Sequence, residues 1–283
     1  MRQETANPAA LSDRDFNRLS TFIHDYCGIT MQQAKRSMLE SRLSKRVRAT
    51  GIASLSAYVD YLFSPEGAAH EKIHMIDAVT TNKTDFFREP DHFAYLTRKA
   101  LPAIFSGMTA NRNVMIWSAG CSTGEEPYTL AMVLSEYHEQ QPGARFVILA
   151  TDLSTRVLEA AAQGIYDEDR VEPVPPELRK KYLLRSKDQS KSLVRMSHGL
   201  RSLIHFRQLN FMEGDFGMRE PMDVIFCRNV IIYFDKPTQE RLLTRFVKHL
   251  RPGGYLFLGH SESLNGLNVP LQPVAPTIYR RPL

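Results

Sequence analysis

Residues 114–127 read VMIWSAGCSTGEEP, and this stretch decides the fold. The apolar run at 114–117 is typical of a buried strand. Small residues follow it, and the segment from Pro127 onward places Leu130, Val133 and Leu134 on one helical face. Proline suits a first helical turn, where its missing N–H is not needed. A strand, a tight turn and a helix form the first unit of a parallel sheet covered by helices.

The same alternation continues toward the C-terminus. Apolar segments at 146–151, 224–227 and 255–258 predict further strands. Ser154 is placed to cap a helix after the second strand, and a helix over about 238–250 ends before Pro252 and two glycines. We therefore predict an α/β fold with a doubly wound sheet over residues 93–283.

The first eighty residues have a different pattern. Ser12 and Asp15 resemble a capping box, and Phe16, Leu19 and Ile23 recur at helical spacing. We predict an all-helical domain over 11–80 and a linker over 81–92. Short strands are expected at 182–184, 193–196 and 203–206, which we interpret as a small antiparallel β-subdomain inserted at about 180–208.

Composition sets broad limits. The chain has 283 residues, 43% of them hydrophobic, and a formal net charge of +5, which favours an acidic partner without identifying its class. Cys27, Cys121 and Cys227 lack the spacing of a disulfide framework or a metal site, so we expect no metal. The beginning of the sequence lacks a secretory pattern and the apolar runs are interrupted by charge, so we expect a cytoplasmic protein without membrane insertion.

The turn after the first strand indicates the class of ligand. Gly120 and its small neighbours let a ligand approach the backbone, but Glu125 and Glu126 would repel a pyrophosphate. Asp152 ends the second strand, and we favour ribose binding over helix capping for it. S-adenosylmethionine has a ribose and a positive sulfonium but no phosphate, so it fits this pattern.

Two other polar segments can reach the same edge of the sheet. Asn82, Thr84 and Arg88 lie at the domain junction, where the alternative is a solvated linker, although the neighbouring phenylalanines suggest that the segment packs down. Arg228 and Asn229 follow a predicted strand, and a structural hydrogen-bond network is an equally good interpretation there.

One helical region is strongly basic, with Glu40 as the only acid between residues 31 and 50. A solvated face is the usual explanation for such a helix, but this imbalance favours a surface that docks an acidic partner. The candidate docking residues are Lys35, Arg36, Arg42, Lys45, Arg46 and Arg48.

Five ordered segments together resemble the chemotaxis receptor methyltransferases, the CheR family, over nearly the whole chain. They are TTNKTDFFREPDHF at 80–93, WSAGCSTGEEPYTLAM at 117–132, ATDLSTRVLEAAAQGIY at 150–166, FCRNVIIYFDKPTQE at 226–240 and LGHSESL at 258–264. The resemblance implies a helical N-terminal domain, a Rossmann-like S-adenosylmethionine-dependent methyltransferase domain and an inserted β-subdomain. It also implies methylation of chemoreceptor glutamates to glutamyl 5-O-methyl esters, with S-adenosylhomocysteine as the second product, in adaptation during bacterial chemotaxis.

The resemblance also implies site residues. The family's cofactor contacts fall on Asn82, Thr84, Arg88, Gly120, Glu126, Asp152, Asn210, Phe211, Arg228 and Asn229. Arg88 and Tyr233 would lie nearest the transferred methyl group. The implied partners are the cytoplasmic methylation helices of membrane-bound receptor arrays, and we expect a monomer that does not bind nucleic acid.

This sequence departs from the family pattern at two places. Alanines often stand in the family where Gly120 and Cys121 lie, a change between small residues. The turn at 185–192 has no glycine, unlike the turn of members that bind a receptor's C-terminal pentapeptide, so we do not expect that tether. The alternatives are a nucleic-acid methyltransferase and a non-catalytic adaptor that senses S-adenosylmethionine.

Overall fold

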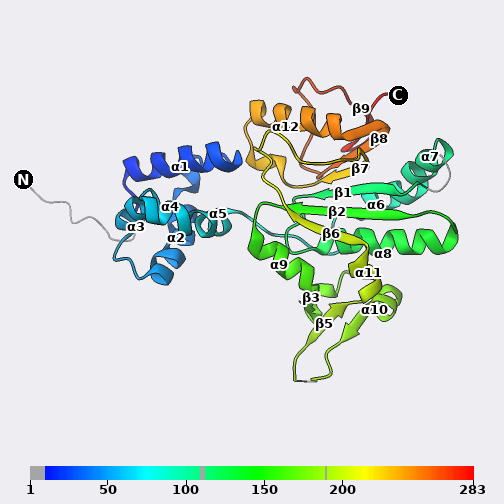
Figure 1. The fold of residues 1–283 in the computed structure, drawn as a ribbon, viewed down its shortest axis with the longest axis horizontal. Coiled ribbons are helices and arrows are strands. Elements are labelled where there is room, and N and C mark those ends of the chain that lie inside the picture. Colours follow the sequence, from blue (N-terminus) through cyan, green and yellow to red (C-terminus); the bar gives the residue numbers. More distant parts are fainter. Residues whose placement is uncertain (1–9, 109–111, 189) are drawn as a thin grey trace, which may run out of the picture. The chain divides into compact units, whose positions relative to one another are not determined.

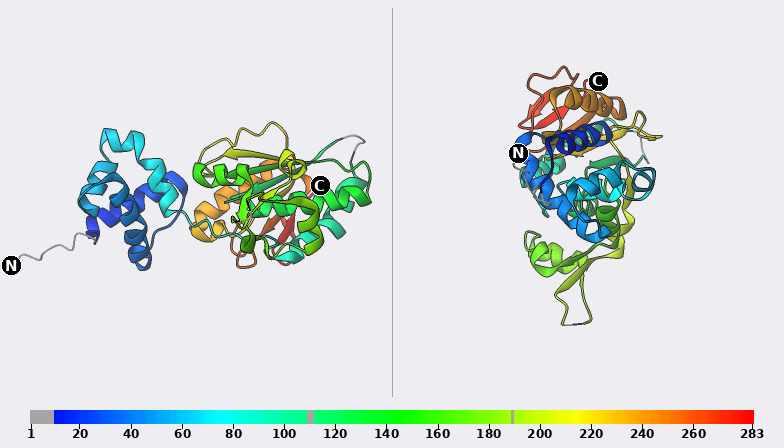
Figure 2. Two further views of the ribbon diagram at one scale, coloured as in Figure 1. Left: turned by 90° about the horizontal axis from the view of Figure 1, so that it is seen from below. Right: turned by 90° about the vertical axis from the view of Figure 1, so that its left-hand side faces the viewer.

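The computed structural model describes residues 10–108, 112–188 and 190–283, and the chain forms two compact units. The smaller unit runs to Thr81 and includes Tyr233–Asp235, and the larger one comprises Asn82–Ile232 and Lys236–Leu283. Figures 1 and 2 show the elements of each unit. Among the described residues, no helix combines the length and the hydropathy that a bilayer span requires.

The smaller unit is helical, as the sequence predicted. Its elements are α1 (Asp13–Cys27), the short η1 (Gln33–Lys35), α2 (Arg36–Thr50), α3 (Leu55–Leu62), α4 (Pro65–His70) and α5 (Lys72–Val79). The Asp15 amide donates to Ser12 Oγ at 3.0 Å, so the predicted cap of α1 is confirmed. Leu19, Ile23 and Leu43 are fully buried and form part of its core.

A buried ion pair joins α2 to the start of α5. Arg46 donates from Nε and Nη2 to the two carboxylate oxygens of Glu71 at 2.7 and 2.8 Å, and the Tyr58 hydroxyl donates to Glu71 Oε1 at 2.8 Å. Burial acts to raise the pKa of Glu71, but Arg46 and Tyr58 outweigh it and leave the pKa below its usual value. The Glu71 carboxylate is therefore held in its ionised form.

The larger unit alternates strands and helices. It begins with α6 (Pro90–Tyr95), η2 (Leu96–Ala100), α7 (Leu101–Ser106), β1 (Val114–Ala119), α8 (Glu125–Gln140), β2 (Phe146–Asp152) and α9 (Thr155–Gln163). It continues with β3 (Ile165–Asp167), η3 (Glu168–Val171), α10 (Pro176–Tyr182), β4 (Leu183–Arg185), β5 (Leu193–Met196), α11 (His198–Ser202) and β6 (Ile204–Gln208). The last elements are β7 (Met222–Cys227), η4 (Ile231–Tyr233, which crosses the unit boundary), α12 (Lys236–His249), β8 (Leu250–Leu258), β9 (Gln272–Ala275) and β10 (Ile278–Arg280).

The main sheet has seven strands in the order β6-β2-β1-β7-β8-β10-β9 (Figure 1). The first five are parallel, and β10 and β9 complete the sheet in antiparallel pairing. The chain continues from β1 to β2 on one side, whereas β7 occupies the other side of β1. Ligands of such sheets bind where the strand order reverses, at the carboxyl ends of the strands. Here that position is the end of β1, so the predicted doubly wound fold is confirmed.

A separate three-stranded antiparallel sheet, ordered β3-β5-β4, projects from the main one (Figures 1 and 2). The prediction that residues 203–206 belong to this small sheet is wrong, because β6 pairs in parallel with β2 at the edge of the main sheet. The third strand of the small sheet is instead β3, which precedes the predicted insertion. The glycine-free turn joins β4 to β5, and its Gln189 lies outside the described residues.

The three cysteines, Cys27, Cys121 and Cys227, are free and buried. Aromatic side chains fill much of the remaining core. Trp117 is fully buried and donates from Nε1 to Thr151 Oγ1 at 2.9 Å, which satisfies its polar atom. The central strands are therefore held by close packing that fixes where their carboxyl ends lie.

We expect Arg46→Ala to destabilise the protein by about 3 kcal/mol at neutral pH, because it leaves the Glu71 carboxylate buried without its cation. Since the folded-state pKa of Glu71 is lowered, the pair stabilises above the unfolded-state pKa of about 4.3 and loses this effect as the pH falls through the folded-state value. Urea unfolding of wild type and variant measures this difference.

The matched control is Lys45→Ala at the exposed neighbouring position. Its free energy of unfolding should stay within about 0.5 kcal/mol of the wild type. Equal losses from both variants, or an Arg46→Ala loss that does not shrink in acid, would contradict the role given to the ion pair.

Candidate functional site

The loop after β1 is shaped by a close backbone approach. Gly120 has a φ of +86°, and a Cβ built there would lie 2.5 Å from Val230 Cγ2, so a side chain would both strain the backbone and clash. Gly124, with a φ of +100°, precedes the first residue of α8. The loop therefore brings main-chain atoms close to the segment that follows β7.

Asp152 connects this loop to the next helix. Its Oδ2 accepts the Ser122 amide at 2.8 Å and its Oδ1 accepts the Ser154 amide at 3.0 Å. The cap of α9 is Ser154 itself, whose Oγ accepts the Val157 amide. Asp152 is half-buried at the carboxyl end of β2, the edge at which ligands of such sheets bind. Its position thus fits both a structural and a ligand-binding role.

The segment from Asn82 to Arg88 packs against the larger unit, as its two phenylalanines suggested. Ser122 Oγ donates to the Asn82 carbonyl at 2.8 Å, and Arg170 Nη2 donates to the Thr84 carbonyl at 2.9 Å. Phe86 is 1% exposed, and the Phe87 amide donates to Thr129 Oγ1. This segment is therefore fixed beside the loop that follows β1.

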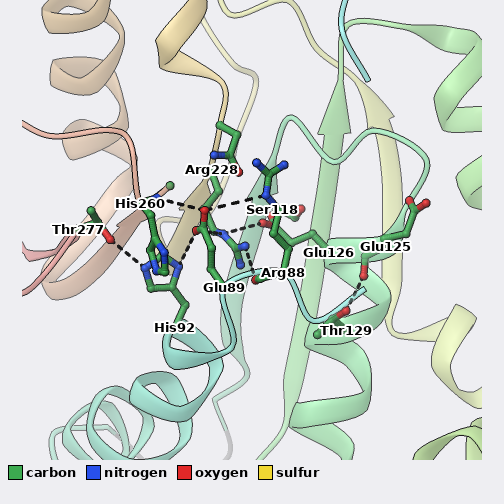
Figure 3. Close-up of polar contacts among 12 residues, drawn as sticks. Arg88, Glu89, His92, Ser118, Glu125, Glu126, Thr129, Arg228, His260 and Thr277 are labelled. Atoms are coloured by element: carbon green, nitrogen blue, oxygen red, sulfur yellow. Dashed lines mark hydrogen bonds and ion pairs between the residues drawn. The ribbon is translucent and has the colours of Figure 1, made fainter. Parts of the chain in front are cut away.

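Arg228 lies at the centre of the polar cluster in Figure 3. Its side chain is 3% exposed, and its Nε lies 3.3 Å from Glu89 Oε2 and 3.5 Å from Glu126 Oε2. Nη2 donates to the backbone carbonyl of Arg88, whereas Nη1 has no hydrogen-bond partner among the described residues. The guanidinium also lies over the Phe93 ring, 5.3 Å from its centroid. One buried cation thus contacts two carboxylates and holds the backbone at Arg88.

The two carboxylates respond differently to their surroundings. Burial raises the pKa of Glu126, although Arg228 and the hydroxyl of Ser118, which donates to Oε1 at 2.7 Å, act against this effect. Burial also acts to raise the pKa of Glu89, but Arg228 and the His260 amide outweigh it, so this pKa is lowered. Arg88 Nε also lies 4.0 Å from Glu89 Oε1, so the two carboxylates face two guanidinium groups, and the cluster offers both signs of charge to a ligand.

His92 adjoins the same cluster. The side chain is 2% exposed, and its Nδ1 lies 3.5 Å from Glu89 Oε2. Burial, followed by the nearby charge of Arg228, lowers the pKa of His92 to about 4. The imidazole is therefore neutral at physiological pH. Sequence reasoning did not select His92 or Glu89, because neither belongs to a recognisable ligand spacing.

The loop after β7 is fixed by a second buried acid. Glu262 accepts the amides of Asn229, Ile232 and Gly259 at 2.8, 3.2 and 2.7 Å. Asn229 has a φ of 58°, and a Cβ at Gly259 would lie 2.5 Å from Asn229 Nδ2. Arg228 and Asn229 are thus held by a structural hydrogen-bond network, and they also lie at the sheet edge where a ligand would bind. Both interpretations from the sequence, a structural network and ligand contact, therefore retain support.

Asn210 and Phe211 follow β6 at the same edge. The Leu209 amide donates to the Asp152 carbonyl at 2.9 Å, and Asn210 Oδ1 accepts the Met212 amide at 3.0 Å. Phe211 is 9% exposed and packs edge-on against Trp117. The pattern reasoning missed both residues because it assigned β6 to the wrong sheet. The usable signal was the alternating pattern of β6, which would have placed Asn210 and Phe211 at the sheet edge if this strand had been paired with β2.

The two candidate catalytic residues belong to different units. Arg88 lies in the larger unit with 36% of its side chain exposed, and its Nη1 makes one long hydrogen bond, 3.4 Å, to the Lys83 carbonyl. Tyr233 lies in the smaller unit, where its carbonyl accepts the Thr30 amide and Lys35 Nζ lies 5.7 Å from the centroid of its ring.

The six candidate docking cations differ in the contacts that they make. Arg36 pairs with Asp13 at 2.6 Å, Arg42 donates to carbonyls at the end of α5, and Arg46 pairs with Glu71. Lys35 lies near Thr30 and the Tyr233 ring. Lys45 and Arg48 are exposed and make no ion pair among the described residues. Three of the six cations therefore stabilise the helical unit itself.

Comparison with known families accounts for both units. Residues 82–279 match the model described as CheR methyltransferase, SAM binding domain, and residues 14–80 match the CheR methyltransferase all-alpha domain. The second of these models accounts for the helical unit that the sequence predicted.

Curated relatives are similar over nearly their full lengths. A chemotaxis protein methyltransferase of Borreliella burgdorferi is 38% identical over 94% of this chain and 94% of its own. One from Klebsiella aerogenes is 38% identical over 98% and 92%, and chemotaxis protein methyltransferase 2 of Pseudomonas aeruginosa is 39% identical over 94% and 92%. With both domain models and these relatives in agreement, this chain belongs to the CheR methyltransferase family and has its S-adenosylmethionine-binding domain.

Proposed function

We propose that this protein transfers the methyl group of S-adenosylmethionine to glutamate side chains of bacterial chemoreceptors. The products would be glutamyl 5-O-methyl esters and S-adenosylhomocysteine, and the reaction would serve adaptation in chemotaxis. Membership of the CheR methyltransferase family supports this activity. The observation that carries it in the structure is the cluster of buried charges around Arg228, which offers both carboxylates and guanidinium groups at the carboxyl edge of the sheet.

The charges of this edge suit the cofactor. S-adenosylmethionine carries a carboxylate, an ammonium group and a positive sulfonium, and it therefore needs both signs of charge in its site. Glu126 supplies a poorly solvated carboxylate, and Arg228 Nη1 is a buried donor that lacks a partner within the described chain. Such an unsatisfied donor costs free energy unless a ligand satisfies it. The residues present thus fit the cofactor.

The proposed cofactor contacts surround this edge. They come from the segment before α6, the loop after β1, and the ends of β2, β6 and β7: Asn82, Thr84, Arg88, Gly120, Glu126, Asp152, Asn210, Phe211, Arg228 and Asn229. Asp152 would accept hydrogen bonds from the ribose hydroxyls, and the buried Phe211 would contact an apolar part of the ligand.

Methyl transfer to glutamate requires positioning more than proton transfer. When bound, the cofactor supplies a methyl group activated by the positive sulfur. A substrate glutamate with a pKa near 4.3 is already ionised at neutral pH, so it needs no general base. Orientation of reacting groups can lower a barrier by roughly 7–11 kcal/mol in favourable models. The residues of this chain therefore act mainly by holding the carboxylate in place.

Arg88 is our candidate for orienting the substrate carboxylate. Its guanidinium is partly exposed and weakly held, whereas its backbone carbonyl is fixed by Arg228. A fixed main chain with an accessible guanidinium suits charge-assisted hydrogen bonding to an incoming carboxylate. The family resemblance is the support for our proposal that Tyr233 shapes the path of the methyl group.

The cytoplasmic methylation helices of membrane-bound receptor arrays are the proposed partner. Lys45 and Arg48 are the strongest docking candidates on α2, because both are exposed and neither forms an ion pair with another described residue. Long-range attraction between these cations and acidic receptor helices would speed encounter. We further propose a cytoplasmic monomer that acts without a pentapeptide tether.

Transfer of labelled methyl groups tests the activity. The purified chain, labelled S-adenosylmethionine and receptor cytoplasmic fragments should give labelled receptor that releases its label in mild alkali, because carboxyl methyl esters hydrolyse readily. Alkali-stable label, or label on added DNA or RNA instead of the receptor, would contradict the proposal. Cofactor binding without any transfer would favour a sensing adaptor.

The same assay separates catalysis from cofactor binding. Arg88→Ala should lower kcat by about 100-fold or more while the Kd for S-adenosylhomocysteine changes less, since Arg88 is one of several proposed cofactor contacts but is the residue proposed to orient the substrate carboxylate. Arg98→Ala, at an exposed arginine of the same unit, is the matched control. Unchanged transfer kinetics in Arg88→Ala would remove the catalytic assignment.

Docking is tested by charge reversal on α2. At low salt, the Lys45→Glu/Arg48→Glu variant should raise KM for the receptor fragment by about tenfold with little change in kcat, and the difference should shrink as salt screens it. Arg98→Glu/Lys99→Glu changes the net charge equally and should have a smaller effect. A KM that is independent of salt, or the same in both variants, would rule out this docking surface.

A further inference from the structure

The buried His92 imidazole is held from one side by Thr277. Its Nε2 lies 2.9 Å from Thr277 Oγ1, and Thr277 Oγ1 in turn lies 2.8 Å from the Pro276 carbonyl, which can accept its proton. When the hydroxyl donates to Pro276, Thr277 Oγ1 accepts an N–H from Nε2. In this tautomer His92 Nδ1 presents a lone pair, which is the form that binds a metal ion.

This lone pair faces a second acceptor. His92 Nδ1 lies 3.5 Å from Glu89 Oε2, and neither atom has a hydrogen-bond partner among the described residues. The His92 side chain is 2% exposed and that of Glu89 11% exposed, so solvent contributes little there. Two buried acceptors directed at each other repel, and a cation between them would remove the cost. Arg228 Nε approaches Glu89 Oε2 at 3.3 Å and is closer to this oxygen than the imidazole is.

A third potential ligand completes the cluster, which Figure 3 shows. One ligand atom from each of Glu89, His92 and His260 lies within 4.8 Å of the others. The His92 and His260 rings are nearly perpendicular, with centroids 5.1 Å apart. Glu89 Oε1 accepts the His260 amide at 3.2 Å, which fixes the loop after β8 against α6. His260 is exposed, so an ion could enter from its side.

Two residues of this cluster have backbone conformations that are unfavourable for residues other than glycine. Glu89 has a φ of 56° and Thr277 also has a φ of 56°, a region that residues other than glycine rarely adopt. Such strained residues persist where the surrounding structure fixes them, and they concentrate at functional sites. Here one strained residue carries the carboxylate, and the hydroxyl of the other contacts the imidazole.

We propose that Glu89, His92 and His260 form a binding site for a divalent transition-metal ion of the Zn²⁺ type. Two imidazole nitrogens and one carboxylate oxygen are a common ligand set for such ions, and water would complete the coordination. The positive charge of Arg228 beside Glu89 weakens the attraction, so we expect micromolar affinity. An ion bound to Glu89 Oε2 would compete with Arg228 for that carboxylate.

The ligands of this site could not be identified from cysteine or histidine spacing. Glu89 and His92 lie on either side of the start of α6, whereas His260 follows β8 near the end of the chain. The sequence expectation of no metal rested on the isolated cysteines, which take no part here.

Titration of the full chain with Co²⁺ tests the site, because its visible d–d absorption reports coordination directly. The wild type should bind one Co²⁺ with absorption typical of nitrogen ligation, and Zn²⁺ should displace it. His260→Ala should weaken Co²⁺ binding by at least tenfold, since it removes one of three protein ligands. The matched control is His205→Ala, at an exposed histidine of β6 in the same unit.

The variants also distinguish lost binding from lost folding. His260 is exposed, so its variant should keep the far-UV circular dichroism and the unfolding midpoint of the wild type, and Glu89→Gln provides a second ligand deletion. Loss of Co²⁺ binding in both folded variants supports the site. Absence of a one-to-one complex at 100 μM Co²⁺, or equal binding by wild type, His260→Ala and Glu89→Gln, would overturn it whatever the methyl-transfer assay gives.

Discussion

The buried guanidinium of Arg228 is the interaction on which the proposed site depends. It contacts the carboxylates of Glu89 and Glu126 and donates to the backbone at Arg88. Elements that are far apart in the sequence, the end of β7, the start of α8 and the segment before α6, are joined at this one cation. A buried ion pair contributes less to stability than its Coulomb energy suggests, because both charges lose hydration. Its more direct effect here is to fix the positions of the polar groups around it.

The parallel sheet explains why these groups meet. Strands β2, β1 and β7 pair in register, so Asp152, Gly120 and Arg228 all follow the same edge. Gly120 permits close approach of the β1 loop to Val230, and Glu262 fixes the loop after β7 by accepting its backbone amides. The position of the strand ends therefore determines which side chains can contact one ligand. Charge then restricts the ligand, because a site that offers both signs of charge suits a cofactor with a carboxylate, an ammonium group and a sulfonium.

The local features were predictable from the sequence, and the long-range pairings were not. The strand at 114–117, the caps at Ser12 and Ser154, and the packed Phe86 follow from periodicity and capping preferences. The sheet membership of β6 depends on a partner strand far away in the chain, and its wrong assignment hid Asn210 and Phe211. From the sequence alone, Arg46 would be interpreted as a surface cation, because its partner Glu71 lies two helices further along the chain.

The same limit applies to the acids and histidines of the site. Glu89 and His92 become notable only because Arg228, His260 and Thr277 lie beside them in the fold. A family resemblance could place the cofactor contacts on this chain, but it gave no reason for the charge balance. The structure supplies that reason, because it places Glu89 and Glu126 beside Arg228 and Arg88, so that the site offers both signs of charge.

The most direct test of this account is a double-mutant cycle between Arg228→Met and Glu89→Gln, measured as the free energy of unfolding. Arg228→Met alone should cost about 3–5 kcal/mol, because it leaves two buried carboxylates without their cation. Adding Glu89→Gln should recover at least about 1 kcal/mol of that loss, since it removes one of the unpaired charges. Strictly additive losses would mean that the two residues do not interact energetically, and the central role given to Arg228 would be wrong.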